Sequence, residues 1–182
     1  MQGSLTGRLL VALPLLEDPN FDRAVVFVLD HDEDGALGVV LNRASDVAVE
    51  EALAGWSALA ARPAVMFGGG PVEPTAVVAL GRDTPLLSVG DADPDAGAVR
   101  LVDVSEGPPS DQLEEVRVFA GYAGWAPGQL EGEIEQGAWT SVEALPEDVF
   151  TDDPDGLWHR VLARQPGRLR LLAGFPADPS VN

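Results

Sequence analysis

Residues 116–133 of this chain read VRVFAGYAGWAPGQLEGE, and they say more about the fold than any other stretch. Their first part, 116–120, is rich in β-branched and aromatic residues and predicts a strand. The glycines that follow allow a sharp bend between Tyr122 and Trp125, and a proline then starts a helix predicted over 127–136. The favoured interpretation is a strand–loop–helix corner with both aromatic rings packed inside. A recognition surface, which also uses Tyr and Trp, is the alternative.

Short apolar segments on both sides of this corner predict further strands. They are bounded by turn residues and lie at 8–13, 23–29, 36–41, 64–67, 76–80 and 138–142, with weaker strands at 86–89 and 99–102. Apolar residues at helical spacing predict helices near 46–61 and 154–165, with Asp46 and Asp153 as N-caps. This pattern is not a regular βαβ array. We therefore expect an α/β (α+β) fold with a mixed sheet and three to four packed helices.

The length of 182 residues fits one domain spanning 1–182. Residues 81–111 are rich in proline, glycine and aspartate and predict a mobile edge of loops; a loose C-terminal tail is expected over 173–182. No apolar run approaches the roughly 20 residues that a membrane-spanning helix needs. The first residues also lack a basic n-region. We therefore expect a cytoplasmic protein without membrane contact.

The chain has neither cysteine nor lysine, since all 11 basic residues are arginine. Disulfides, thiolate nucleophiles, thiolate zinc sites and iron–sulfur clusters are therefore excluded. A Schiff base, a Walker lysine and a Ser–Lys dyad are excluded as well. No cofactor is expected.

The formal net charge is −19, which repels phosphate backbones over a Debye length of about 8 Å. A G+C-rich genome and adaptation to high salt would both account for this composition. The single basic cluster comprises Arg160, Arg164, Arg168 and Arg170, which we interpret as arginines that complement a helix dipole. Because no helix-turn-helix with a basic recognition helix is visible, direct binding to nucleic acid is not expected.

Residues 30–35, DHDEDG, contain the opening of a calcium-binding loop. The position that should supply a bidentate glutamate is Leu41, and the flanking segments predict strands where the loop needs helices. We therefore interpret the segment as an acidic hairpin turn and expect no metal there.

His31 and His159 are the only imidazoles. His31 has neighbouring aspartates that would suit a general base, but no G-x-S-x-G elbow supplies a serine for it. A two-histidine metal site would require both side chains to meet in the fold. A structural or surface role is favoured for both, and no catalytic residue is assigned.

The glycines of Gly68-Gly69-Gly70-Pro71 follow a predicted strand. Their amides would suit an anion, as in a nest, but the segment lacks lysine and G-x-G-x-x-G, and Glu73 follows it. A tight strand exit that needs a positive φ is the favoured interpretation.

Taken together, these motifs resemble the YqgE/AlgH family of bacterial proteins. The resemblance covers about residues 3–165, and GYAGWAPGQLE at 121–131 is its most specific part. Ala44 and Gly81-Arg82 depart from the family pattern, which commonly has proline and Leu-His at these places. The other matching segments are 7–12 with Pro14, 18–21 with Arg23, His31 with 35–38, 41–43, 69–72, Trp139, 149–150 and 157–158.

The resemblance implies an α/β fold with a mixed, strongly bent sheet in a bacterial, cytosolic protein. It supplies no reaction: most members are described as uncharacterised, and one branch is called a transcriptional regulator connected with alginate production. We expect a non-enzymatic regulatory module that binds a protein or a small-molecule ligand and acts indirectly. One alternative is a hydrolase that uses His31 with nearby acids, with or without a metal. The other is a regulator that binds DNA directly.

We expect one binding surface at a cleft where several strands end. Asn42 and Arg43 close an apolar strand with an amide and a guanidinium, the groups that a small carboxylate or a peptide carbonyl requires. In the competing interpretation Arg43 only pairs with Glu131 or Asp18 to hold loops in place. The full predicted surface comprises Asn20, Phe21, His31, Asn42, Arg43, Gly69, Gly70, Tyr122, Trp125, Gln129 and Glu131.

Overall fold

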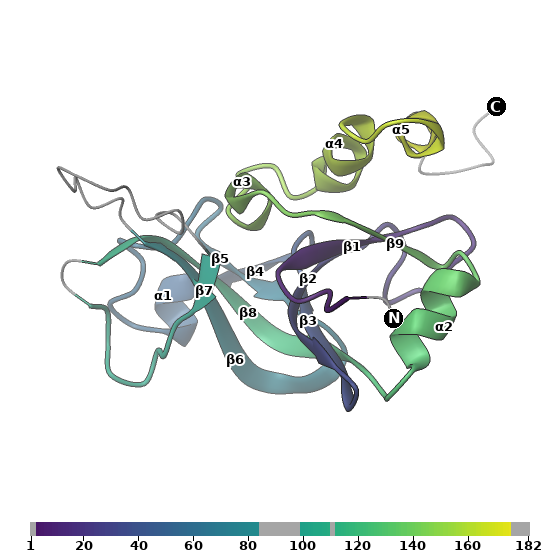
Figure 1. Ribbon diagram of the computed structural model, residues 1–182. Coiled ribbons are helices and arrows are strands. Elements are labelled where there is room, and N and C mark those ends of the chain that lie inside the picture. Colours follow the sequence, from purple (N-terminus) through teal and green to yellow (C-terminus); the bar gives the residue numbers. More distant parts are fainter. Residues whose placement is uncertain (1–2, 84–98, 110–111, 176–182) are drawn as a thin grey trace, which may run out of the picture.

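The computed structural model describes residues 3–83, 99–109 and 112–175. Within them, strands and short helices form a single α+β domain (Figure 1). The strands are β1 (Arg8–Ala12), β2 (Val25–Asp32), β3 (Gly35–Val40), β4 (Ala44–Ala48), β5 (Val65–Gly68), β6 (Val72–Asp83), β7 (Val99–Leu101), β8 (Leu113–Trp125) and β9 (Trp139–Glu143). The helices are α1 (Val49–Ala52), α2 (Gln129–Glu135), α3 (Pro146–Val149), α4 (Leu157–Ala163) and α5 (Arg168–Leu172).

The nine strands form one open sheet in the order β4-β5-β8-β3-β2-β1-β9, with β6 and β7 attached through β8. Among the strands that the structure describes, only β5 and β8 pair in parallel and the other pairings are antiparallel; an isolated parallel bridge joins Ala60 to Val116 of β8. The predicted mixed sheet is therefore confirmed. The long strands β6 and β8 curve strongly and join the two halves of the sheet (Figure 1).

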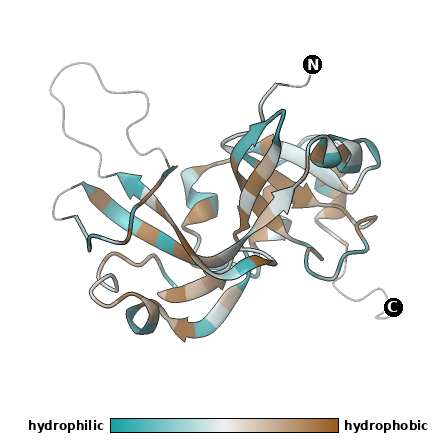
Figure 2. Ribbon diagram, turned by 90° about the horizontal axis from the view of Figure 1, so that it is seen from below, coloured by the Kyte–Doolittle hydropathy of each residue, from teal (hydrophilic) through white to brown (hydrophobic). Residues whose placement is uncertain are grey.

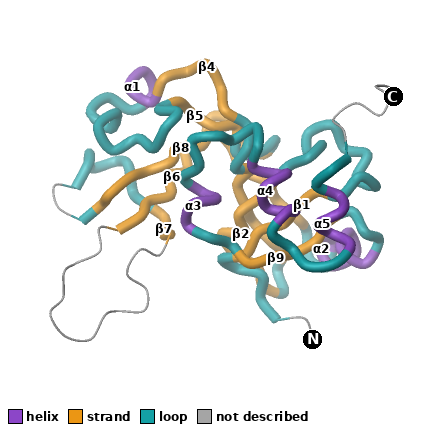
Figure 3. The backbone as a smooth tube through the Cα atoms, turned by 90° about the horizontal axis from the view of Figure 1, so that it is seen from above, coloured by secondary structure: helices purple, strands orange, loops and turns teal. Residues whose placement is uncertain are grey.

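The middle strands β1, β2 and β3 are apolar over most of their length because both faces of this half of the sheet are covered. In β1, Leu9 and Val11 belong to the core cluster that contains α4, whereas Leu10 and Ala12 belong to the cluster that contains Leu130 of α2. This alternation follows from the two-residue period of a strand. Helices α4 and α5 lie over β1, β2 and β9, whereas α3 lies to the side, where its Glu147 approaches Arg82 of β6 (Figure 3). Hydrophobic residues make up most of the middle strands (Figure 2).

Three glycines allow the sheet to bend where β5, β6 and β8 meet. A Cβ atom on Gly69 would lie 2.2 Å from the carbonyl oxygen of Gly121, and one on Gly121 would lie 2.6 Å from that of Gly70. Gly70 and Gly121 also have φ values of 153° and 74°, which disfavour residues with a side chain. The predicted tight exit from β5 is confirmed.

The predicted helix over 46–61 is wrong. Strand β4 continues to Ala48, so Asp46 lies in a strand and caps no helix, and α1 is a single turn. Gly55, at φ 87°, turns the chain soon after α1, and the buried Trp56 reaches its core cluster from this turn. The apolar residues of 46–61 therefore recur at helical spacing because they are buried from a loop. Tertiary packing here overrides the local preference for a helix.

The other two predicted helices are present but shorter, as α2 and α4. The prediction of Asp153 as the N-cap of α4 is wrong, because Gly156 occupies that position. Asp153 Oδ1 instead accepts a hydrogen bond from the Gly156 amide in the preceding turn.

Part of the predicted mobile edge is ordered, because 81–83 and 99–101 pair as β6 and β7. Residues 102–109 belong to no helix or strand, whereas 84–98, with the weak strand expected at 86–89, and 110–111 lie outside the described residues. Most of the predicted tail, 176–182, lies outside them as well. None of the helices in the described ranges is long and apolar enough to cross a membrane.

Candidate functional site

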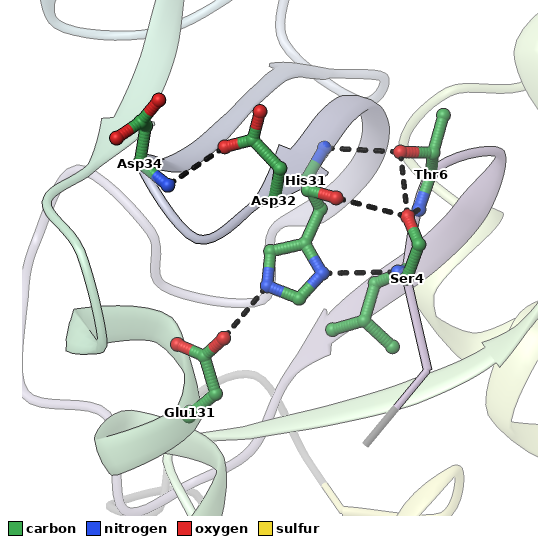
Figure 4. A network of polar contacts seen from close by, with 7 residues as sticks. Ser4, Thr6, His31, Asp32, Asp34 and Glu131 are labelled. Carbon is green, nitrogen blue, oxygen red and sulfur yellow. Dashed lines mark hydrogen bonds and ion pairs between the residues drawn. The ribbon is translucent and has the colours of Figure 1, made fainter. Parts of the chain in front are cut away.

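His31 lies at the end of β2, buried between the N-terminal segment and α2 (Figure 4). Its Nδ1 accepts a hydrogen bond from the Leu5 amide at 3.0 Å, and its Nε2 lies 2.8 Å from Glu131 Oε1. An amide N–H only donates, so Nδ1 must hold the lone pair and Nε2 must carry the proton. Ser4 Oγ donates to the His31 carbonyl, and Thr6 Oγ1 accepts from the His31 amide.

His159 is held in the opposite tautomer. Its Nδ1 lies 2.8 Å from the Ala173 carbonyl oxygen, which only accepts, so Nδ1 carries the proton. Its Nε2 lies 3.2 Å from Arg23 Nη1, which only donates, so Nε2 holds the lone pair. Both imidazoles are therefore neutral in this arrangement, and both lone pairs are occupied by protein donors.

The acidic segment 30–35 forms the predicted hairpin turn. Asp32 pairs with Gly35 across the turn, and Asp32 Oδ1 accepts the Asp34 amide at 2.8 Å. In the ranges that the structure describes, no three His, Cys, Asp or Glu side chains are grouped to hold a metal ion.

The corner predicted from 116–133 is an aromatic cluster anchored by α2. The rings of Phe21, Trp125 and Trp139 pack with centroid distances of 5.4 to 6.3 Å. Both indole Nε1 groups donate to Glu133 Oε2 at 2.9 Å, and Gln129 donates to Glu133 Oε1 at 2.8 Å. The most specific motif of the chain therefore has a structural role in joining β8, β9 and α2.

Asn42 also has a structural role, because its amide bridges two backbone groups. Oδ1 accepts from the Val25 amide at 3.0 Å, and Nδ2 donates to the Arg23 carbonyl at 2.8 Å. These bonds hold Arg23 at a φ of 53°, which is unusual for a residue with a side chain. The bent chain places Arg23 at the wall of a cavity.

This cavity, which we call the Arg43 cavity, has a volume of about 310 Å³. Arg43 is half-buried there. Its Nη1 donates to the carbonyl of Asn42, and its Nη2 donates to the carbonyl of Asp22. Burial lowers the pKa of Arg43, and the nearby carboxylates of Asp22 and Asp155 act against this shift. The lining residues are Asp22, Arg23, Asn42, Arg43, Asp155, Trp158 and His159.

The charged groups of Arg43, Asp22 and Asp155 are not paired with one another. In the described part of the chain no carboxylate oxygen lies within 4.0 Å of the Arg43 guanidinium. Glu131 and Asp18 are therefore not its partners, although Arg43 does tie two segments of the chain together through the carbonyls of Asn42 and Asp22. The Arg43 cavity therefore combines a half-buried cation with two carboxylates to which it is not paired.

A larger concavity of about 1100 Å³, the charged basin, lies between the sheet and the α3–α4 segment. Its arginines are mostly engaged: Arg82 lies 3.2 Å from Glu115, and Arg164 lies 2.6 Å from Asp148. Arg160 pairs with Asp153 in the same way. We interpret the basin as an ion-pair network that holds α3 and α4 against the sheet, because three of its four arginines are paired with carboxylates; the fourth, Arg62, is exposed at its edge.

The predicted single surface is divided into separate groups, so the expectation of one shared concavity is wrong. Trp125 pairs with Ala36 at one end of β3. Asn42 follows the other end, six residues further along, or about 20 Å away at the rise of a strand. The corner beside α2 contains Phe21, His31, Trp125, Gln129 and Glu131. The bend of the sheet contains Gly69, Gly70 and Tyr122. The Arg43 cavity contains Asn42 and Arg43, and an exposed turn contains Asn20.

Sequence reasoning missed several residues that matter in the structure. Asp22, Asp155 and Trp158 reach the Arg43 cavity from distant parts of the chain. Trp158 belongs to a segment of the family pattern that indicates no cavity, and no local motif marks Asp22 or Asp155. Arg117 is also unmarked: it is 1% exposed and donates to the backbone carbonyls of Arg62, Pro63 and Thr151. Burial lowers the pKa of Arg117 to about 10.

The fold is shared with proteins of known structure. A crystal structure of a protein from Corynebacterium diphtheriae aligns with a TM-score of 0.82 and 33% identity, covering 96% of this chain and 94% of that one. The solution structure of the AlgH protein from Pseudomonas aeruginosa aligns with a TM-score of 0.66 and 28% identity, covering 98% and 100%.

The sequence is similar to curated proteins over nearly its whole length. A UPF0301 protein of Streptomyces avermitilis is 50% identical over 191 residues, covering 98% of this chain and 96% of the relative. A UPF0301 protein of Mycobacteroides abscessus is 44% identical over 181 residues, covering 97% and 87%. The model of the AlgH-like family matches residues 9–170. The resemblance to YqgE/AlgH proteins is thus confirmed, and this chain belongs to the AlgH-like family.

Proposed function

We propose that this protein is a non-enzymatic binding module that recognises a carboxylate-bearing ligand at the Arg43 cavity and has a regulatory role through that binding. One observation carries the proposal: Arg43 is half-buried without a carboxylate partner among the described residues, while Asp22 and Asp155 lie exposed beside it. A guanidinium fork matches a carboxylate with two parallel hydrogen bonds.

The state of the two imidazoles favours binding over hydrolysis. A general base needs a lone pair that can reach a substrate proton. The lone pair of His31 accepts from the Leu5 amide, and that of His159 accepts from Arg23. The hydrolase alternative would require one of these structural hydrogen bonds to break first.

Two of the four arginines near the C-terminus support indirect regulation over direct contact with DNA. Arg160 and Arg164 are paired with Asp153 and Asp148. To bind a phosphate of DNA, each arginine would have to give up its ion pair with the protein carboxylate. The net charge of −19 opposes such an approach over the whole surface.

The proposal is tested by titrating the ¹⁵N-labelled protein with a panel of carboxylates: acetate, succinate, the free amino acids and their N-acetyl derivatives. At least one should shift the side-chain resonances of Arg43 and Trp158, and Arg43→Gln should abolish that shift. Arg100→Gln, on β7 and remote from the cavity, should bind like the wild type. Unchanged spectra throughout the panel, or equal binding by Arg43→Gln, would contradict the proposal.

A separate assay tests the hydrolase alternative. The wild type, His31→Ala and Glu131→Gln are compared on ester, amide and phosphate substrates. We expect no turnover that depends on His31. Turnover that survives in Glu131→Gln but disappears in a folded His31→Ala protein would favour the enzyme.

A further inference from the structure

We propose that the ligand of the Arg43 cavity is a small zwitterion of the amino-acid class, with its carboxylate on Arg43 and its ammonium group on Asp22 and Asp155. This inference rests on the function proposed above and specifies the ligand. The cavity offers both signs of charge within one small volume, and only a ligand with both signs satisfies them together.

Arg43 supplies the carboxylate half of the site. Two of its guanidinium N–H groups donate to the carbonyls of Asn42 and Asp22. The others have no protein acceptor in the residues that the structure describes. Because the side chain is half-buried and held by these two carbonyls, it loses little further freedom when a carboxylate binds. Its position is therefore fixed before the ligand arrives.

Asp22 and Asp155 supply the ammonium half. Both are exposed, and within the described ranges neither side chain takes part in a hydrogen bond or an ion pair. Their charges act on Arg43, so they lie near it without contacting its guanidinium. A carboxylate ligand alone would meet their repulsion. A ligand that also carries an ammonium group converts this repulsion into attraction.

The charge balance and the size of the cavity limit the ligand further. The lining has two guanidiniums, of Arg23 and Arg43, and two carboxylates, and His159 adds no charge in its neutral tautomer. A volume of about 310 Å³ is at the low end of the range for ligand sites, about 300–1,000 Å³. One small molecule without net charge fits these limits.

The wall of the cavity is closed by aromatic packing. The Arg23 guanidinium lies over the Trp158 ring, 4.8 Å from its centroid, and Trp158 Nε1 donates to the Ala12 carbonyl at 2.8 Å. This wall is therefore fixed to β1 and α4. A rigid wall suits recognition of one small ligand better than recognition of a flexible peptide.

The inference is tested by calorimetric titration with each proteinogenic amino acid. The tightest binder is then compared with its N-acetyl derivative, its amide and its decarboxylated amine. Each of these three changes removes one charge and should weaken binding by at least about tenfold. Asp155→Asn and Asp22→Asn should weaken binding of the free amino acid but strengthen binding of the N-acetyl derivative, whose carboxylate no longer meets that repulsion. Asp152→Asn, an exposed acid outside the cavity, serves as the control.

The outcomes separate the inference from the function on which it rests. If the N-acetyl derivative binds as tightly as the free amino acid, and Arg43→Gln abolishes both, the zwitterion inference is overturned and the carboxylate site stands. A peptide that binds through its C-terminal carboxylate more tightly than any free amino acid overturns the inference in the same way. If no carboxylate binds to the folded wild-type protein, both proposals are overturned.

Discussion

His31 and Glu131, which are 100 residues apart in the chain, are joined by a hydrogen bond of 2.8 Å between Nε2 and Oε1. The other ring nitrogen accepts the Leu5 amide. One imidazole thus connects the N-terminal segment, the β2–β3 hairpin and α2. A residue that sequence alone would allow as a general base therefore acts as a structural bridge.

Replacement of His31 should reduce stability. His31→Ala leaves the Leu5 amide without an acceptor and removes the partner of Glu131, so the free energy of unfolding should fall by about 1–3 kcal/mol. His31→Asn retains an acceptor oxygen and should restore part of this loss. Urea denaturation followed by circular dichroism measures both. An alanine variant as stable as the wild type would show that the bridge contributes nothing.

The carboxyl groups of Glu131 and Glu115 should contribute to the free energy of unfolding with opposite dependences on pH. The backbone amide of Glu131 and then the His31 imidazole hold the pKa of Glu131 below its ordinary value of 4.5. Its stabilising effect is therefore complete above pH 4.5 and is lost as the pH falls through the lower folded value. Burial raises the pKa of Glu115, so its ionised form costs stability near neutrality and this cost disappears on acidification.

The comparison uses Glu131→Gln and Glu115→Gln in urea denaturation at a series of pH values. As the pH falls below 4.5, the advantage of the wild type over Glu131→Gln should shrink. As the pH falls from neutrality towards 4.5, the wild type should gain relative to Glu115→Gln. Parallel profiles for the two variants would contradict the assignment.

Glu133 should be the most important acid of α2. Its carboxylate accepts from both indole groups of the corner and from Gln129, and hydrogen bonds to a charged group each contribute about 1.5–3 kcal/mol. Glu133→Gln should therefore lower the free energy of unfolding by about 2 kcal/mol or more and alter the near-ultraviolet circular dichroism of the tryptophans. The exposed Glu135 on the same helix is the control, and Glu135→Gln should leave both measurements unchanged.

The glycines should divide into those that the bend requires and those that it does not. Gly69→Ala places a Cβ atom 2.2 Å from the Gly121 carbonyl oxygen, where neither backbone can move freely, so we expect a loss of about 2 kcal/mol or more. A Cβ atom on Gly132, inside α2, would meet no other atom within 4 Å. Gly132→Ala should raise stability by about 0.5–1 kcal/mol. Thermal unfolding of both variants tests the contrast.

Features that depend on neighbouring residues could be predicted from the sequence. The β2–β3 hairpin follows from apolar runs around DHDEDG, and the β8–α2 corner follows from glycines and a proline between a strand and a helix. The family resemblance combines many such local motifs, and the family match and the structural likenesses confirm it. Segment 46–61 could not be predicted in this way, because burial of Trp56 from a turn produces the same apolar spacing as a helix.

The residues of the Arg43 cavity come together through contacts between segments that are distant in the chain. Asn42 is committed to the backbone of Arg23 and Val25, 19 and 17 residues away, and Asp155 reaches Arg43 from the segment before α4. The types of side chain, most of the strands and the family follow from the sequence alone, whereas β4 does not. Which charges face one another depends on how the sheet bends and which strands pair, and this is settled by burial of apolar surface over the whole chain, which no short segment encodes.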